Sequence, residues 1–209
     1  MRFLISAGPT REKIDVVRFI SNRSSGKMGY ALAEAARAAG GKVVLVSGPT
    51  HLTPPDNVTF IQVESAAEMA TAIHAHASAS DIIIMAAAVA DYRPVKTYPG
   101  KMKKAHGNLV MELERTEDIL LTLGQNKRPG QKLVGFAAET DEVIESAIKK
   151  LQKKNLDWII ANDVSCNDRG FGSDHNAVTM ISASGACDEV ALSDKKTVAR
   201  RIIRKILED

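Results

Sequence analysis

The chain has 209 residues, of which 44% are hydrophobic and 25% are charged, and its formal net charge is +3. This length and composition are typical of one globular α/β domain, and the mild positive charge permits an anionic substrate without requiring nucleic acid. The longest apolar run, residues 82–90, is too short to cross a bilayer, and the N-terminus lacks the apolar length of a signal peptide, so we expect a cytoplasmic protein with no membrane partner.

Extended and helical patterns alternate along the chain, which predicts a single domain over residues 1–209. The expected fold class is α/β: a doubly wound, Rossmann-like, mostly parallel sheet with a C-terminal antiparallel hairpin. Strands are expected at Phe3–Ser6, Lys42–Ser47, Thr59–Gln62, Asp81–Met85, Lys132–Phe136, Trp158–Ala161, Ala177–Ile181 and Asp188–Leu192. Helices are expected at Lys27–Ala39, Ala66–Ala77, Thr116–Gly124, Asp141–Lys154 and Lys195–Glu208.

The stretch between the first strand and the first helix has the composition of an anion site. Gly8 lies at the turn after the strand, and Ser24, Ser25 and Gly26 lead into the helix. The first N–H groups of a helix lack internal partners, and the helix dipole adds partial positive charge there. With the charge of Lys27, this stretch predicts a phosphate cradle, in which the serines cap the helix or donate to the ligand. The alternative is an ordinary surface loop before an alanine-rich helix.

Neither common phosphate-binding motif fits this stretch. The dinucleotide fingerprint G-x-G-x-x-G is reduced to Gly26 and Gly29, and Ser47 and Gly48 stand where a ribose-binding acid is expected. The P-loop pattern requires Ser or Thr after its lysine, where this chain has Met28. The sequence therefore favours a different kind of nucleotide site.

Polar residues and small residues follow several of the predicted parallel strands. Ligands of open α/β sheets bind outside the carboxyl ends of the strands, where Asp91, Phe136 and residues 161–164 are expected. Asp91 suits ribose hydroxyls or a hydrated cation. Phe136 suits stacking on a base, although on placement alone a core position is the more common fate.

Two segments are rich in lysine. Lys101–Gly107 lies in a long non-periodic stretch from Asp91 to Glu114, which is typical of a lid or of disorder. Lys150 and Lys154 share one face of a predicted helix. By charge alone, a solvated surface is the simpler interpretation of both segments.

The cysteines and histidines indicate no structural metal site. Cys166 and Cys187 form no C-x-x-C motif, which is typical of free thiols in a reducing compartment, and a disulfide between them stays open. The five histidines do not have zinc-site spacing.

Six segments, each weak alone, together resemble the bacterial phosphopantothenate–cysteine ligase family, also called phosphopantothenoylcysteine synthetase. They occur in the family's order and with similar spacing over nearly the whole chain. The segments are Ala7–Arg11, Ile20–Gly29, Ala87–Arg93, Lys101–Lys104, Val134–Thr140 and Ala161–Val164.

The resemblance implies a ligase of coenzyme A synthesis. Its substrates are 4′-phosphopantothenate and cysteine, with CTP as co-substrate and Mg²⁺ accompanying the nucleotide. The reaction passes through an acyl-cytidylate and gives 4′-phosphopantothenoylcysteine, CMP and pyrophosphate. The resemblance also implies a homodimer and a functional link to a flavin-dependent decarboxylase.

The resemblance assigns roles to residues as well. Asn22 corresponds to the residue that handles the acyl-cytidylate, and Lys101 to a mobile-loop lysine of the activation step. Positions that match nucleotide contacts of the family are Met85, Ala86, Ala87, Asp91, Lys101, Glu117, Asp118, Ile119, Leu120, Phe136, Lys150 and Lys154. The metal ligands stay unassigned. The chain has Thr-Glu-Asp-Ile at 116–119 where Asn-Pro-Asp-Ile is common in the family, so contacts at Glu117 are expected through the backbone.

Two other function classes were weighed. An NAD(P)-dependent reductase on a similar sheet is disfavoured by the absent fingerprint. A non-catalytic module that binds nucleotide or nucleic acid is disfavoured by the low net charge and the 4% aromatic content.

Overall fold

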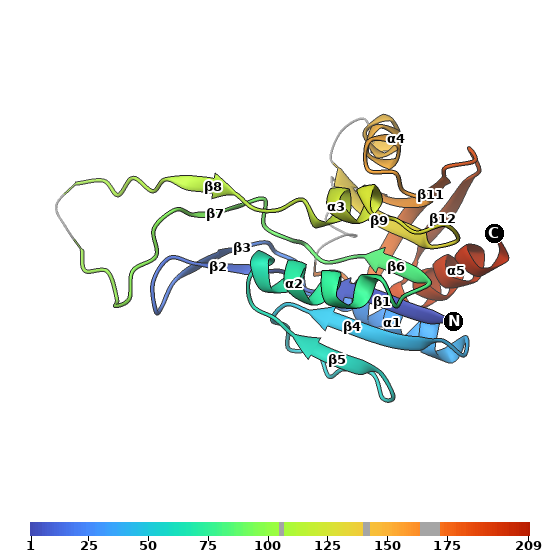
Figure 1. Cartoon of the computed structure of the whole chain (residues 1–209), viewed down its shortest axis with the longest axis horizontal. Coiled ribbons are helices and arrows are strands. Elements are labelled where there is room, and N and C mark those ends of the chain that lie inside the picture. Colours follow the sequence, from blue (N-terminus) through green and yellow to red (C-terminus); the bar gives the residue numbers. More distant parts are fainter. Residues whose placement is uncertain (105–106, 140–142, 164–171) are drawn as a thin grey trace.

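Eight strands form one sheet in the computed structural model, which describes residues 1–104, 107–139, 143–163 and 172–209 (Figure 1). The strand order is β12–β11–β10–β9–β6–β1–β4–β5. The parallel strands are β1 (Arg2–Ala7), β4 (Lys42–Ser47), β5 (Thr59–Gln62), β6 (Ile82–Met85), β9 (Lys132–Glu139) and β10 (Trp158–Asp163). The C-terminal strands β11 (His175–Ser182) and β12 (Cys187–Asp194) join antiparallel at one edge. The predicted fold class, including its hairpin, is confirmed.

Helices cover both faces of the sheet, and the alternation of side chains along each strand explains why. Phe3 and Ile5 of β1 enter the hydrophobic cluster under α1 (Lys27–Ala38) and α5 (Lys195–Glu208). Leu4, between them, enters the cluster under α2 (Ala66–Ala77), α3 (Ile119–Gln125) and α4 (Val143–Lys153). Successive side chains of a strand point to opposite faces, so a continuous apolar run indicates a strand that is buried on both.

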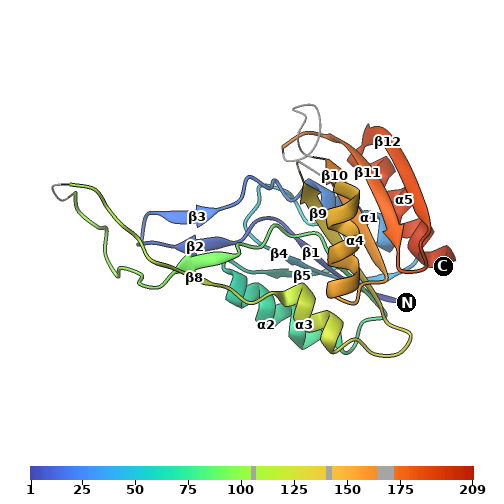
Figure 2. The same ribbon diagram turned by 90° about the horizontal axis from the view of Figure 1, so that it is seen from above.

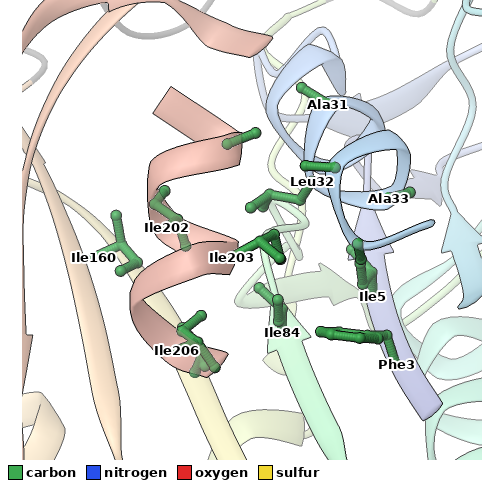
Figure 3. Close-up of a cluster of buried hydrophobic side chains, with 14 of the residues drawn as sticks. Phe3, Ile5, Ala31, Leu32, Ala33, Ile84, Ile160, Ile202, Ile203 and Ile206 are labelled. Atoms are coloured by element: carbon green, nitrogen blue, oxygen red, sulfur yellow. The ribbon is translucent and has the colours of Figure 1, made fainter. Parts of the chain in front are cut away.

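Isoleucines on one side of α5 fill the space between that helix, the sheet and α1 (Figure 3). Ile202, Ile203 and Ile206 lie near Ile84 of β6 and Leu32 of α1. This packing fixes the N-terminal ends of α1 and α5 at the same edge of the sheet.

Several helix ends differ from the prediction by one residue, and two helix starts differ by more. The helix expected from Thr116 begins at Ile119, because the Asp118 side chain caps it by accepting from the Leu121 N–H at 3.0 Å. The helix expected over 141–154 spans Val143–Lys153, and residues 141–142 lie outside the described residues.

Two short strand pairs were missed by the sequence prediction. They are β2 (Arg11–Lys13) with β3 (Phe19–Ser21), and β7 (Tyr92–Pro94) with β8 (Leu113–Arg115). Together with the segments between them they project away from the large sheet (Figures 1 and 2). We call residues 11–21, 92–104 and 107–115 the arm. The stretch from Asp91 to Glu114, expected to be non-periodic and either a lid or disordered, is therefore partly a β-ribbon.

The carboxylate of Asp15 holds the two halves of the arm together. It accepts from the Val17 and Arg18 N–H groups, each at 2.8 Å, and from Arg18 Nε at 3.0 Å. It also accepts from the Met102 N–H at 3.1 Å, across the arm. The hydrogen bonds from Arg18, ahead of those from the backbone, hold the pKa of Asp15 well below its usual range.

Two further findings bear on the sequence expectations. Among the described helices, none has both the length and the apolarity that a membrane crossing requires. Cys187 is an exposed free thiol, whereas Cys166 lies outside the described residues.

Candidate functional site

A cleft of about 420 Å³ lies at the carboxyl ends of β6, β9 and β10, between the N-terminal ends of α1, α3 and α5. This is the edge at which open α/β sheets bind ligands, and the volume is typical of a small-molecule site. The predicted site residues that line it are Asn22, Ser24, Ser25, Gly26, Met85, Ala86, Ala87, Asp91, Glu117, Asp118, Ile119, Leu120, Phe136 and Lys154. Gly8, Lys101 and Lys150 are not among its lining residues.

The floor of the cleft is apolar. Met85, Ala86 and Ala87 follow β6, and Phe136 belongs to β9. Phe136 is half-buried: it packs against the core and also borders the cleft, and its stacking on a base stays a prediction. Small side chains beside an aromatic ring give a flat surface on which a base can lie.

The start of α1 forms the predicted cradle with a different cap. Gly26 is the N-cap in the left-handed conformation, at φ 79°, and the helix has no side-chain cap. Ser24 instead accepts from the Gly26 N–H at 3.3 Å, so of the two roles expected for the serines, capping of α1 is wrong and donation to a ligand stays a prediction. Because no side chain caps the first turn, its N–H groups remain available to an anion in the cleft.

Glycines bring the cradle close to the sheet. A Cβ on Gly29 would lie 2.5 Å from the Ala7 Cβ, so α1 approaches β1 as closely as the backbone allows. Gly8 lies behind Gly26, and its carbonyl accepts from the Ala88 N–H at 2.9 Å. Gly8 therefore supports the cradle from behind, and its role as a binding residue stays a prediction.

Asn22 joins the segment before α1 to the segment after β6. Its Nδ2 donates to the carbonyl oxygens of Ala88 at 3.0 Å and Val89 at 3.3 Å. Nearby, Asp91 lines the cleft with its side chain exposed. Thr116 fixes this segment, because its hydroxyl donates to the Ala90 carbonyl at 2.5 Å.

The opposite wall comes from α3 and α4. Lys154 Nζ donates to Asp118 Oδ1 at 2.9 Å. Glu117 pairs with His74 Nε2 at 2.7 Å, and this hydrogen bond, with the charge of His74, lowers the pKa of Glu117. The Glu117 carboxylate is thus held by His74, which agrees with an expected contact through the backbone. Lys150 is exposed and lies outside the cleft.

Lys101 is also distant from the cleft lining. It is exposed and precedes Met102, whose N–H and carbonyl are bonded to Asp15 and Arg18 in the arm. Residues 105–106 of the predicted lid lie outside the described residues.

Sequence reasoning missed one end of the cleft. Asn176 and Lys195 line it there, together with Lys27 and Asn162. Lys195 Nζ donates to the Ser173 carbonyl at 2.6 Å, and burial, with a smaller effect from Lys27, lowers the pKa of Lys195. The position of Lys195 could have been noticed in the sequence. The helix dipole disfavours a cation at the first position of a helix, so a lysine there is a sign of a functional residue.

The described residues contain no group of three His, Cys, Asp or Glu side chains placed to hold a metal ion. The described cleft offers the carboxylates of Asp91, Glu117 and Asp118, of which Glu117 and Asp118 are paired with cationic or titratable side chains. This donor set fits a Mg²⁺ ion held largely by phosphate oxygens and water, with Asp91 as the protein ligand.

Comparison with known proteins agrees with this geometry. The sequence model of the family described as DNA/pantothenate metabolism flavoprotein C-terminal domain matches residues 1–208. The coenzyme A biosynthesis bifunctional protein CoaBC of Bacillus subtilis (strain 168) is 50% identical over 204 residues, which cover 97% of this chain and 50% of the relative. The chain thus spans about half the length of the curated relatives it matches.

Two solved structures are similar over the whole chain. The crystal structure of the C-terminal domain of coenzyme A biosynthesis bifunctional protein CoaBC is 51% identical, with a TM-score of 0.85, and the match covers 100% of this chain and 96% of that one. A Cab2 mutant in complex with phosphopantothenate-cysteine has a TM-score of 0.82 at 19% identity, over 99% of this chain and 85% of that one. At that identity the second likeness concerns the fold alone.

Proposed function

The chain belongs to the family described as DNA/pantothenate metabolism flavoprotein C-terminal domain, and from this premise we propose that its cleft joins 4′-phosphopantothenate to cysteine with CTP. The observation that carries the proposal is one cleft that combines an uncapped helix start at Gly26 with an apolar floor beside Phe136. The first suits phosphates and the second suits a base. The 50% identity to a coenzyme A biosynthesis protein supports the same assignment.

The proposed reaction has two halves. A carboxylate oxygen of 4′-phosphopantothenate attacks the α-phosphorus of CTP, and the bond from that phosphorus to the bridging oxygen breaks, so that pyrophosphate leaves with the electron pair. The cysteine amine then attacks the acyl carbon, CMP leaves, and the amine loses a proton. Activation is needed because a free carboxylate is a poor acyl donor.

The protein's part in this chemistry is positioning and charge stabilisation. The N–H groups at the start of α1 face the place where negative charge develops. Asn22 is held by Ala88 and Val89 at the rim of the cradle, where its amide can orient the acyl group. Bound Mg²⁺ would supply Lewis-acid neutralisation of phosphate charge, with Asp91 as its protein ligand.

We also propose that two copies pair through the arm. Large apolar side chains are exposed along it, among them Val16 at 67%, Leu109 at 61% and Val110 at 90% exposure. Apolar groups gathered on a projecting ribbon mark an interaction surface, and the family resemblance implies a homodimer. A functional link to a flavin-dependent decarboxylase and a cytoplasmic location belong to the same proposal. Light scattering should give the mass of two chains, and Val110→Glu should shift it towards one.

A substrate-omission experiment tests the proposed function. Pyrophosphate release is measured with CTP and 4′-phosphopantothenate, with and without cysteine, and with each substrate left out. We expect pyrophosphate to need both CTP and the acyl substrate but not, for the first turnover, cysteine. Pyrophosphate release at the same rate with and without 4′-phosphopantothenate would contradict the proposal. Tight binding of NADPH would favour a reductase instead.

A further inference from the structure

The end of the cleft beside α5 is a polar corner that includes two residues, Asn176 and Lys195, to which no sequence motif assigned a role. We call Lys27, Asn162, Asn176 and Lys195 the α5 corner. All four line the cleft. Asn162 follows Ile160 by two residues on β10, so it faces the same side of the sheet as α1 and α5. Asn176 lies on the neighbouring strand β11, and Lys195 is the first residue of α5.

The two asparagines have hydrogen-bonding capacity that the fold does not use. Asn176 is only 2% exposed, and the Oδ1 atoms of both Asn162 and Asn176 are buried without a partner among the described residues. Leaving a buried polar group unsatisfied is costly, which suggests that a ligand completes it. As placed, these oxygens can only accept, and ionised phosphate oxygens also only accept, so a phosphate completes the two sites only with each amide turned by 180° about its last torsion, which puts the NH₂ donors in place of Oδ1.

The charges of the corner select an anion. Lys27 and Lys195 lie close enough that Lys27 disfavours the charged form of Lys195. The helix starts of α1 and α5 add partial positive charge at the same place. Two acidic side chains are nearby. Asp174 pairs with Lys27 at 2.6 Å, and Asp194 caps α5 through the Thr197 N–H at 3.0 Å and its hydroxyl at 2.6 Å.

Lys195 is 7% exposed, and a largely buried cation beside a second cation and two helix starts is stabilised best by a multiply charged anion. An ammonium group or a free metal cation would add to the repulsion. The corner also adjoins the cradle at Gly26 without being part of the floor beside Phe136. It therefore lies where a chain of phosphates extends after passing the start of α1.

We propose that the α5 corner seats the β- and γ-phosphates of the nucleoside triphosphate and holds them as pyrophosphate when the α-phosphorus is attacked. This inference rests on the proposed function. The bond that breaks joins the α-phosphorus to the bridging oxygen, and the electron pair stays on the departing pyrophosphate. Lys195 and Lys27 offset that charge, and the amides of Asn162 and Asn176 donate to phosphate oxygens. In this arrangement Lys195 supplies charge stabilisation that the sequence had suggested for Lys101.

Calorimetric titration of the full chain with inorganic pyrophosphate tests the seat directly. The variants are Lys195→Gln, Lys195→Arg and Asn176→Asp, with Lys196→Gln as the matched control. Lys196 is the next residue of α5, and its side chain is 67% exposed and paired with Glu34. Thermal unfolding of each variant verifies that it is folded.

We expect Lys195→Gln and Asn176→Asp to weaken pyrophosphate binding about tenfold or more, since each removes or opposes a charge-assisted hydrogen bond. Lys195→Arg should bind close to the original affinity, and Lys196→Gln should change it less than about twofold. Unchanged pyrophosphate affinity in both Lys195→Gln and Asn176→Asp would overturn the proposal, and so would equal losses in Lys195→Gln and Lys196→Gln.

Titrations with CTP, CMP and cysteine separate this inference from the proposed function. Lys195→Gln should weaken CTP but leave CMP unchanged, because CMP has no β- and γ-phosphates. Equal weakening of CTP and CMP would overturn the seat, as would Lys195-dependent binding of cysteine without pyrophosphate. If CTP does not bind at all while the binding of pyrophosphate still depends on Lys195, the pyrophosphate site at the α5 corner is supported and the proposed function is refuted.

Discussion

Asn22 donates from its side-chain amide to the carbonyl oxygen of Ala88, 3.0 Å away, and so joins the segment before α1 to the segment after β6. The two segments leave adjacent parallel strands, β1 and β6, at the same edge of the sheet. The contact holds the amide in the cleft that the first turn of α1 also lines. The proposed function therefore assigns acyl handling and phosphate handling to different groups that line the same cleft.

Asn22→Asp should stop the reaction after activation. The change keeps the size of the side chain, removes the donor to Ala88 and adds negative charge beside an anionic intermediate. Loss of one preorganised group typically costs ~10²–10³ in rate. Product analysis with CTP, 4′-phosphopantothenate and cysteine should show accumulated acyl-cytidylate. Asn57→Asp, at an exposed loop position, is the control and should react normally. An Asn22→Asp variant that fails before pyrophosphate release would refute this assignment.

CTP should be preferred over ATP by at least about tenfold in kcat/KM, because hydrogen bonds to the cytosine edge would be left unpaired by adenine. Lys154, held at the wall by Asp118, lies beside the proposed base position. Lys154→Gln should therefore lower kcat/KM for CTP more than for ATP. Lys149→Gln removes an exposed lysine of α4, the helix that Lys154 directly follows; it is paired with Glu145, and the change should have little effect. Equal kcat/KM for the two nucleotides would show that base recognition does not occur here.

Gly29→Ala should destabilise the fold and distort the cradle. The new methyl would lie 2.5 Å from the Ala7 Cβ, so α1 must move away from β1. Overpacking of this kind costs about 1–3 kcal/mol in the free energy of unfolding, which urea denaturation measures. Gly100→Ala, with no atom within 4 Å of its added methyl, should change stability by less than about 0.5 kcal/mol. Equal stability of Gly29→Ala and the original chain would show that α1 is not in close contact with β1.

The clamp at Asp15 should persist into acidic solution. The clamp is the set of hydrogen bonds that the Asp15 carboxylate accepts from Val17, Arg18 and Met102. Arg18 lowers the pKa of this carboxyl in the folded chain. The clamp is therefore fully formed at any pH above the ordinary carboxyl pKa of about 3.9, and it is lost only as the pH falls through the lowered pKa of the folded chain. NMR titration of the Met102 amide should give a midpoint below the ordinary value. Arg18→Gln should move that midpoint upward, and Asp15→Asn should abolish it. A midpoint at or above about 4 in the original chain would contradict the clamp.

The alternating sheet and the cradle were predictable because their signals are local. Ile82–Met85 is apolar throughout and is buried on both faces, and Gly26 starts a helix whose period was evident from Met28 onward. The motif resemblance predicted the family, and the family match confirms it. The cleft then gathers most of the predicted ligand residues because they follow parallel strands that end at one edge.

The arm could not be predicted in the same way. Its strands are three residues each, and β7 pairs with β8 across a separation that no local pattern records. The family resemblance placed Lys101 at the cleft. In the structure the next residue, Met102, is held in the arm by the hydrogen bond from its N–H to Asp15. The role of Lys101 in activation stays a prediction.

The α5 corner was missed for a related reason. Lys195, Asn176 and Lys27 are far apart in sequence, and each has an ordinary local explanation as a helix or strand residue. Only the packing of α5 against α1, and of β11 beside β10, brings them to one end of the cleft.

The central claim, that this cleft activates a carboxylate as a nucleotidyl anhydride, is tested most directly by trapping the intermediate. The chain is incubated with CTP and 4′-phosphopantothenate without cysteine, quenched rapidly and analysed by mass spectrometry. The account predicts a bound 4′-phosphopantothenoyl-cytidylate that forms with pyrophosphate and is converted by added cysteine to 4′-phosphopantothenoylcysteine and CMP. CDP with inorganic phosphate as the products, or amide formation without any nucleotide-linked acyl species, would contradict it.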